Sequence, residues 1–421
     1  MSDVDVVVIG AGLAGLGAAR ALRDAGRSAL VLEASDRIGG RAWTTHPAAL
    51  GGVWFDMGAV WLHSAEINPL VPIARAAGDA LLRSDELRVE RTFVGTREAT
   101  AEEYADYAGA WQRFEDRAAS ILRTLDDAPL AEVARAMPDD KWAVTVETWE
   151  GPIICCASAD EFSTRDWLRN VLSGSNLVPQ GGIGAFVARR LGEGLDIRLR
   201  TQATLVNWGG PGVAVETPNG TVTARSAIVT VSTGVLAAEA IRFDPPLPAE
   251  TQGAIHALPM GLAIKVALRA TGPDRLDLPL HCSVDRQVKR SGDPTMGFQC
   301  WPYQRDYVQG WVGGPVAWEL ARGGEAVTVD FALGQLRTLF GGRVDRLFAG
   351  GPHFVTRWDA DPFVRGAYSY VRPGDADART ALARPLADGR LLFAGEACHS
   401  GMAGTVAGAW ISGQDAARVA L

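Results

Sequence analysis

The sequence lacks the features that identify metal-binding, disulfide-bonded and membrane-spanning proteins. Its 421 residues include six histidines, which form no HExxH motif, and five cysteines, which form no CxxC pair. We therefore expect no metal site, and we expect free thiols because adjacent Cys155 and Cys156 have poor geometry for a disulfide. No apolar run reaches the ~18 residues that a membrane helix needs, so no membrane partner is expected.

Charge and length exclude further classes. The formal net charge is −8 and no basic tract is present, which argues against nucleic acid as a partner. Residues 1–5 are acidic and unlike a signal peptide, so a cytoplasmic location is expected. A chain of 421 residues with 47% hydrophobic and 21% charged residues is typical of a globular enzyme with two domains.

The most informative pattern lies at the N-terminus. An apolar run, Val4–Ile9, leads directly into GAGLAG and places Gly10, Gly12 and Gly15 at a strand-to-helix turn. Gly10 permits the turn, Gly12 lets the backbone approach a pyrophosphate, and Gly15 allows close packing of helix on strand. With a helix over residues 13–25 and a second strand over 29–32, the segment predicts a dinucleotide-binding βαβ unit.

Two features near this unit indicate which nucleotide is bound. Glu33 ends the second strand, where a carboxylate can accept both hydroxyls of an adenosine ribose and would repel a ribose phosphate, so NADP is disfavoured. Residues 37–41 read Arg-Ile-Gly-Gly-Arg. With them the segment resembles the FAD-binding fingerprint of the flavin amine oxidases, in which the run ending here at Arg41 also touches the cofactor. The resemblance implies FAD.

A second stretch, residues 51–63, alternates glycines with large side chains, as expected of backbone passing along a flat ligand. It resembles the flavin-ring segment of the polyamine oxidase branch, with Ser64 where that branch has glycine. The part implied to follow the ring comprises Gly58, Ala59, Val60 and Trp61. The resemblance also implies that His63 faces the substrate, whereas by sequence alone it could simply cap the following turn.

Lysine is scarce, since the chain contains only Lys141, Lys265 and Lys289. Lys265 lies inside an apolar run, residues 260–268, that alternates as a strand does. One explanation is an edge strand protected by an inserted charge. The run also resembles the amine oxidase strand whose lysine reaches, through a water, toward flavin N5.

The C-terminal region contains a second cofactor motif. A short apolar strand ends in Gly395 and Glu396, and a helix opens at Thr405 and Val406. A carboxylate there can bind the ribityl hydroxyls, and a helix N-terminus stabilises the negative charge that a flavin ring acquires on reduction. This arrangement closely resembles the C-terminal FAD motif of the family.

The resemblance extends to four further positions. It implies that the backbone of Ala203 meets the adenine, and that Trp358 and Tyr368 wall the path of the amine, with Trp358 also touching the cofactor. Ala367 stands where the covalent-flavin members have cysteine, so FAD should be held non-covalently.

The predicted fold class is α/β, with a Rossmann-type FAD-binding domain and a second substrate domain of sheet plus helices. We expect the FAD-binding domain to comprise residues 1–78, 179–255 and 386–421. The substrate domain would contribute a helical part over 79–178, with a strongly helical pattern over 100–137, and a sheet over 256–385. Alternating aromatic residues over 297–320 suggest strands of that sheet.

The resemblance implies an amine oxidase. A hydride would pass from the α-carbon of a neutral amine to flavin N5, water would hydrolyse the imine, and O2 would be reduced to H2O2. Lys265 would hold the water at N5 and His63 would contact the substrate.

Thr405 occupies the place of the second tyrosine in the monoamine oxidase cage, which favours polyamines or secondary amines. A cationic tail would need carboxylates, for which Asp160, Glu161 and Glu319 are candidates. An L-amino-acid oxidase and a catalytically silent FAD scaffold remain alternatives, and the oligomeric state stays open.

Overall fold

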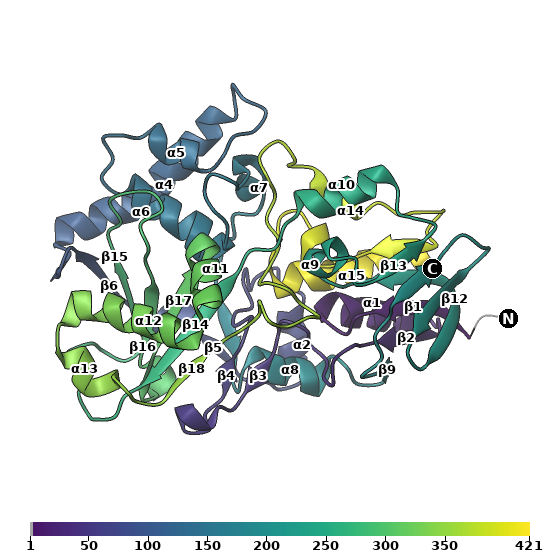
Figure 1. Cartoon of the computed structure of the whole chain (residues 1–421), viewed down its shortest axis with the longest axis horizontal. Helices are drawn as coiled ribbons and strands as arrows, with labels where there is room; N and C mark the ends of the chain where they lie inside the picture. The colour runs from purple at the N-terminus through teal and green to yellow at the C-terminus, as the bar shows by residue number, and fades with distance from the viewer. Residues whose placement is uncertain (1–2) are drawn as a thin grey trace.

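The computed structural model describes residues 3–421 and contains two large sheets that lie side by side (Figure 1). The first has eight strands in the order β13-β10-β11-β12-β1-β2-β9, with β19 also paired to β12. Its central pairs, β12–β1, β1–β2 and β2–β9, are parallel. The strands are β1 (Val4–Ile9), β2 (Ala29–Leu32), β9 (Asp196–Arg198), β10 (Leu205–Asn207), β11 (Val213–Thr217), β12 (Gly220–Val229), β13 (Arg242–Asp244) and β19 (Leu391–Phe393).

Helices cover both faces of this sheet. Val6 and Val8 of β1 pack in one core with α1, α2, α8 and α15, while Val7 and Ile9 pack on the opposite face with α9, α10 and α14. The alternation follows from the two-residue repeat of a strand that is buried on both sides. The helices are α1 (Leu13–Asp24), α2 (Leu70–Ala76), α8 (Ile183–Arg190), α9 (Thr233–Ala237), α10 (Ala249–Ala257), α14 (Ala378–Leu382) and α15 (Val406–Ala420).

The second sheet has seven strands in the order β18-β14-β17-β16-β15-β6-β7. Helices α11 (Gly314–Gly323), α12 (Glu325–Phe340) and α13 (Arg343–Phe348) pack on one face. β6 and β7 fall in residues 79–178, where we expected helices. The strands are β6 (Val89–Val94), β7 (Arg97–Glu98), β14 (Ala263–Arg269), β15 (Cys282–Arg286), β16 (Gly297–Cys300), β17 (Tyr307–Gly313) and β18 (His353–Val355).

A helical layer stands above one end of the second sheet (Figure 1). It contains α4 (Ala101–Ile121), α5 (Ala131–Arg135), α6 (Ala143–Thr148), a π-helix (Trp149–Cys155) and α7 (Thr164–Arg169). Thr100 and Glu103 form a reciprocal capping box at the start of α4. The helix predicted over 100–137 is split in two, because an irregular segment separates the end of α4 from the start of α5. The strands predicted from the aromatic residues over 297–320 end before Trp318, which lies on α11.

Short elements connect these layers. They are β3 (Thr44–Thr45), β4 (Phe55–Asp56), β5 (Leu81–Arg83), β8 (Leu177–Pro179), α3 (Ser84–Leu87) and 3₁₀ turns at Ala48–Leu50, Pro302–Gln304 and Glu396–Cys398. β3 pairs with β4, and β5 pairs with β8. Asp56 of β4 accepts from Ile183 N of α8, which covers the first sheet, and from Lys265 Nζ of β14 in the second, so β4 lies between the two halves of the molecule.

Helices α1 and α15, from opposite ends of the chain, pack at glycine contacts. An ideal Cβ on Gly413 would lie 1.9 Å from the Ala14 carbonyl oxygen, and one on Gly17 would lie 2.7 Å from the Trp410 carbonyl oxygen. A methyl group cannot fit at either place, so the backbones are in direct contact.

We expect Gly413→Ala to destabilise the protein by about 1–3 kcal/mol through overpacking. Gly334→Ala, in the middle of α12, is the matched control, because its Cβ would meet nothing within 4 Å. That substitution should stabilise the protein by about 0.5–1 kcal/mol through helix propensity. Thermal or denaturant unfolding of the two variants measures both changes, and equal effects would contradict the proposed contact.

Candidate active site

One cavity of about 670 Å³ runs between the two halves of the molecule. Its lining extends from Gly10 and Glu33 of the first sheet to Lys265 and Trp311 of the second. This volume lies in the range of small-molecule and cofactor sites.

The start of α1 opens into this cavity. Gly12, Leu13 and Ala14 line it, no side chain caps the helix, and a Cβ on Gly12 would meet nothing within 4 Å. A Cβ on Gly15 would instead lie 1.9 Å from the Gly10 carbonyl oxygen. An uncapped helix N-terminus beside open space is suited to an anionic group such as a pyrophosphate.

Glu33 holds the turn next to this helix. Its carboxylate accepts hydrogen bonds from Ala11 N at 2.7 Å and from Ser35 N at 2.8 Å. Glu33 also lines the cavity, as does Ala203, which lies in the loop before β10. Oε1 also accepts from Ser35 Oγ at 2.7 Å, so the free lone pair is on Oε2, where it could accept from a ribose hydroxyl.

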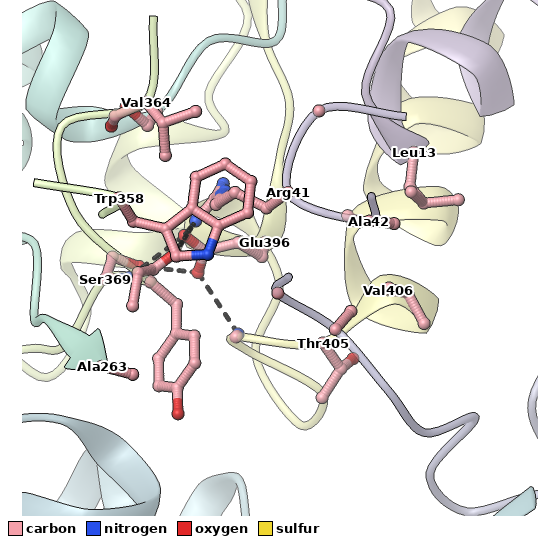
Figure 2. A pocket seen from close by; sticks show the side chains of 18 of the residues that line it. Leu13, Arg41, Ala42, Ala263, Trp358, Val364, Ser369, Glu396, Thr405 and Val406 are labelled. Atoms are coloured by element: carbon pink, nitrogen blue, oxygen red, sulfur yellow. Dashed lines mark hydrogen bonds and ion pairs between the residues drawn. The ribbon is translucent and has the colours of Figure 1, made fainter. Parts of the chain in front are cut away.

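The start of α15 opens into the same cavity. Thr405 caps the helix by accepting a hydrogen bond from Gly408 N at 3.0 Å, and Val406 lines the cavity beside it. Behind them Glu396 is buried and ion-paired with Arg41 at 2.8 Å. Figure 2 shows Glu396, Arg41 and Ser369 grouped behind the Trp358 ring, with Thr405 and Val406 at the first turn of the helix.

The predicted flavin-ring segment, Gly58 to Trp61, lines the cavity along its length. It can pass close to Arg41 because Gly58 has no side chain: a Cβ there would lie 2.0 Å from the Arg41 carbonyl oxygen. Trp358 Nε1 donates to Met57 O at 3.0 Å, which fixes the indole against this segment.

Lys265 lies in the interior of the second sheet. β14 pairs with β17 on one side, where Lys265 is opposite Trp311, and with β18 on the other. The edge-strand explanation is therefore wrong. Nζ donates to Asp56 O at 2.7 Å and to Gly58 O at 2.6 Å, and the residue is 1% exposed. Nζ has three protons, so one remains for a water or ligand in the cavity.

Burial lowers the pKa of Lys265 to about 8, although the charge of nearby Asp56 opposes the shift. The ammonium form still predominates at neutral pH. Asp56 itself accepts hydrogen bonds from Thr44 Oγ1 at 2.5 Å and Ile183 N at 3.1 Å. These contacts tie the lysine, the 56–58 backbone and α8 together.

His63 lies on the cavity wall in a hydrogen-bonded chain. Asn176 Nδ2 donates to the Asp85 carboxylate at 3.1 Å, so its Oδ1 is directed to His63 Nδ1 at 2.6 Å. Because an amide oxygen only accepts, Nδ1 must carry the proton and Nε2 keeps its lone pair. Burial lowers the pKa of His63 below its usual value, so the imidazole is neutral at pH 7.

Tyr368 closes the cavity against the π-helix. Its hydroxyl donates to Ile154 O and accepts from the Cys156 thiol at 3.1 Å. Trp311 Nε1 donates to the neighbouring Ile153 O at 2.7 Å. Ile153 and Ile154 lie in the last turn of this helix, where carbonyls have no intrahelical partner, so the two aromatic donors satisfy its C-terminal end and are oriented by it.

Glu150, on the same π-helix, also lines the cavity. Its carboxyl accepts from Trp167 Nε1 at 2.8 Å, and no ion pair forms with it among residues 3–421. Burial raises the pKa of Glu150 to about 7. The carboxylates considered from sequence lie elsewhere: Asp160 pairs with Arg135, Glu161 accepts from Tyr370, and Glu319 is exposed on α11.

Sequence reasoning missed Glu150, Asn176, Asp85 and the buried pair Asp166–Arg379. The proline in Trp-Glu-Gly-Pro was a usable signal of an irregular helix, but no local pattern marks the others.

A sequence model of the family described as flavin containing amine oxidoreductase matches residues 13–421. The chain belongs to this family. It is a flavin-dependent amine oxidoreductase with FAD as its cofactor, and the predicted fold class and cofactor are confirmed.

Known proteins are similar to this one over nearly the whole length of the chain. A rice (Oryza sativa subsp. japonica) protein named polyamine oxidase 4 is 30% identical over 99% of this chain and 88% of its own length. Human lysine-specific histone demethylase 2 is 27% identical over 99% of this chain, which spans 53% of that protein. A putrescine oxidase structure superposes with a TM-score of 0.82 at 21% identity, covering 99% of this chain and 98% of its own, and shows the same fold.

The cavity fits FAD on its own geometry. It joins an uncapped helix N-terminus beside Glu33 to a second helix N-terminus beside Glu396, as the two halves of a dinucleotide require. Across residues 3–421, no cluster of three or more histidine, cysteine, aspartate or glutamate side chains could hold a metal. No helix in the same range is long and apolar enough to cross a membrane.

We expect acid precipitation to release all of the flavin into the supernatant. Ala367 has no nucleophile, and burial raises the pKa of the cavity-lining Cys155 thiol well above its usual value, so no thiolate is available to attack the ring. Absorbance of pellet and supernatant measures the split. Colour retained by the washed pellet would contradict a non-covalent cofactor.

Proposed function

We propose that the chain oxidises a diamine or polyamine and that Glu150 binds the ammonium group remote from the reacting carbon. The supporting observation is a carboxyl that lines the cavity without a cationic partner. Three other cavity acids are ion-paired: Glu396 with Arg41, Asp166 with Arg379 and Asp85 with Arg88. The remaining two, Glu33 and Asp361, accept hydrogen bonds from nearby backbone N–H groups. The names of the rice relative and of the putrescine oxidase support the same substrate class.

FAD supplies the hydride acceptor and the reaction with O2, so the chain's own residues bind, orient and exclude water. We propose that Lys265 holds a water with its third ammonium proton while its other two fix the carbonyls of Asp56 and Gly58. The same contacts keep the Gly58–Trp61 segment in place along the ring position.

His63 would receive the proton of the reacting amine. Its Nε2 lone pair is available because Asn176 holds the proton on Nδ1, and a neutral imidazole can accept from an ammonium. Trp358 and Tyr368 would form the walls of the amine path, since both are fixed by hydrogen bonds to backbone carbonyls.

An L-amino-acid oxidase ranks second because a substrate carboxylate needs a free cation. The arginines that line the cavity are engaged: Arg41 and Arg379 with carboxylates, Arg88 with Asp85, and Arg37 with Gly40 O and the Trp43 ring. A silent FAD scaffold is disfavoured because Lys265, after bonding the two carbonyls, still has one ammonium proton to offer to the cavity that it lines. We further propose a cytoplasmic location, supported by five free thiols.

The experiment mixes the purified flavoprotein anaerobically with spermidine, putrescine, butylamine and L-amino acids. Bleaching should be fastest with the amines that carry a second ammonium group. Glu150→Gln should lower the diamine-to-butylamine ratio of kcat/KM at least tenfold at pH 8, or about 1.4 kcal/mol. Faster reduction by an amino acid would favour the alternative, and no bleaching by any compound would favour the scaffold.

The same ratio should depend on pH in the wild-type protein. Glu150 is protonated below its pKa of about 7, so the ratio falls as the pH decreases through 7 and is highest above it. Glu150→Gln should remove this dependence. Glu161→Gln is the control, because Glu161 lies outside the cavity, and it should leave both the ratio and its pH profile unchanged.

Lys265→Met should slow flavin reduction or reoxidation at least tenfold, a barrier change of about 1.4 kcal/mol. Lys141→Met is the control, since that lysine is exposed and pairs with Asp106 on the surface. Stopped-flow absorbance measures both half-reactions, and the FAD content of each preparation verifies loading. Wild-type kinetics in a fully loaded Lys265→Met protein would remove this lysine from the mechanism.

A further inference from the structure

A row of alternating charges, buried except for the partly exposed Arg41, lies along one wall of the cavity. It contains Arg41, Glu396, Arg379 and Asp166, which come from four separate parts of the chain. Arg379 is 2% exposed, Asp166 1% and Glu396 4%. Arginine and carboxylate side chains are rarely buried to this extent, so the arrangement requires an explanation.

Asp166 and Arg379 form a bidentate pair. Arg379 Nε donates to Asp166 Oδ1 at 2.9 Å and Nη2 donates to Oδ2 at 3.0 Å. Asp166 lies on α7 in the helical layer, and Arg379 lies on α14 beside the first sheet. The pair therefore connects the two halves of the molecule.

Ser369 links this pair to the carboxylate of Glu396. Arg379 Nη1 donates to Ser369 Oγ at 3.0 Å, and Ser369 Oγ donates to Glu396 Oε2 at 2.9 Å. Ser369 N and Arg41 Nη1 donate to the other oxygen, Oε1, at 3.1 and 2.8 Å. Figure 2 shows the contacts among Arg41, Ser369 and Glu396.

The row contains two positive and two negative charges, so its net charge is zero. Burial alone would raise the pKa of Glu396, but Arg41 and Arg379 outweigh it and keep that pKa below its usual value. In a poorly solvated site the loss of any one member leaves a net charge that water does not screen.

We propose that Asp166 and Arg379 are positioning residues that fix Glu396 and balance the charge beside the bound flavin, and thereby set the reduction potential of the cofactor. The proposal rests on FAD binding, which the family assignment establishes, and is independent of the substrate. Flavin reduction adds negative charge to the ring, so a nearby positive charge favours the reduced form and a negative charge opposes it.

The experiment measures the midpoint potential of the FAD-loaded protein and its variants by dye equilibration. Asp166→Asn leaves Arg379 unbalanced, and a guanidinium cannot lose its proton. It should therefore raise the reduced-to-oxidised ratio at a fixed solution potential at least threefold, about 14 mV for a two-electron couple. Arg379→Lys keeps the charge and should leave the potential unchanged.

The double variant Asp166→Asn/Arg379→Met separates electrostatics from structure. It removes one charge of each sign, so the potential should return to the wild-type value even though FAD affinity and thermal stability fall further. Asp274→Asn breaks the surface pair with Arg343, away from the cavity, and should not alter the potential. An unchanged potential in Asp166→Asn, or equal shifts in the single and double variants, would overturn the proposal.

Discussion

The direct backbone contact between α1 and α15 determines where the site can be. The two helices come from opposite ends of the chain, and glycines at 17 and 413 bring them together without side chains between them. Both helices begin at the same cavity, α1 at Gly12 and α15 at Thr405. Two helix N-termini that open into one cavity offer positive dipole ends to two parts of one elongated anionic ligand, and neither helix alone could do this.

Lys265 connects the second sheet to the segment that lines the cavity beside these two helices. Burying an ammonium in an interior strand is costly unless its protons are bonded, and here the carbonyls of Asp56 and Gly58 provide two acceptors. Those carbonyls belong to the segment predicted to follow the flavin ring, which lines the cavity from Met57 to Trp61. The lysine therefore fixes the position of one sheet relative to the other and, through the same bonds, presents its remaining proton to the cavity.

Much of this site is predictable from sequence because its residues are local to recognisable turns. Gly10 stands between β1 and α1, Glu33 directly follows β2, and Thr405 is the N-cap of α15, so geometry restricts the residue type at each position. Asn176 and Glu150 are different. Asn176 meets His63 from 113 positions away, and Glu150 acquires its role from burial by a partner helix, so neither leaves a periodic or local signal.

Partners that are distant in the sequence also explain the two wrong predictions of secondary structure, the all-helical region over 79–178 and the single helix pattern over 100–137. β6 and β7 lie in a region whose composition favours helix, but β6 pairs in parallel with β15, almost two hundred residues later. Strand formation there depends on a partner that sequence periodicity does not reveal. The turn that splits the predicted helix over 100–137 leads to Pro129 and Leu130, which bond to the segment before α7.

The π-helix organises one side of the cavity through its close approach to the second sheet. Glycines at 261, 297, 313 and 314 allow it to approach the second sheet, since a Cβ at Gly313 would lie 2.1 Å from Pro152 O and one at Gly297 would lie 2.6 Å from the Trp149 ring. The last carbonyls of a helix have no intrahelical partner. Here Ile153 O and Ile154 O, in the last turn, accept from Trp311 and Tyr368, so the end of the π-helix fixes two cavity walls while Glu150, near its start, also lines the cavity.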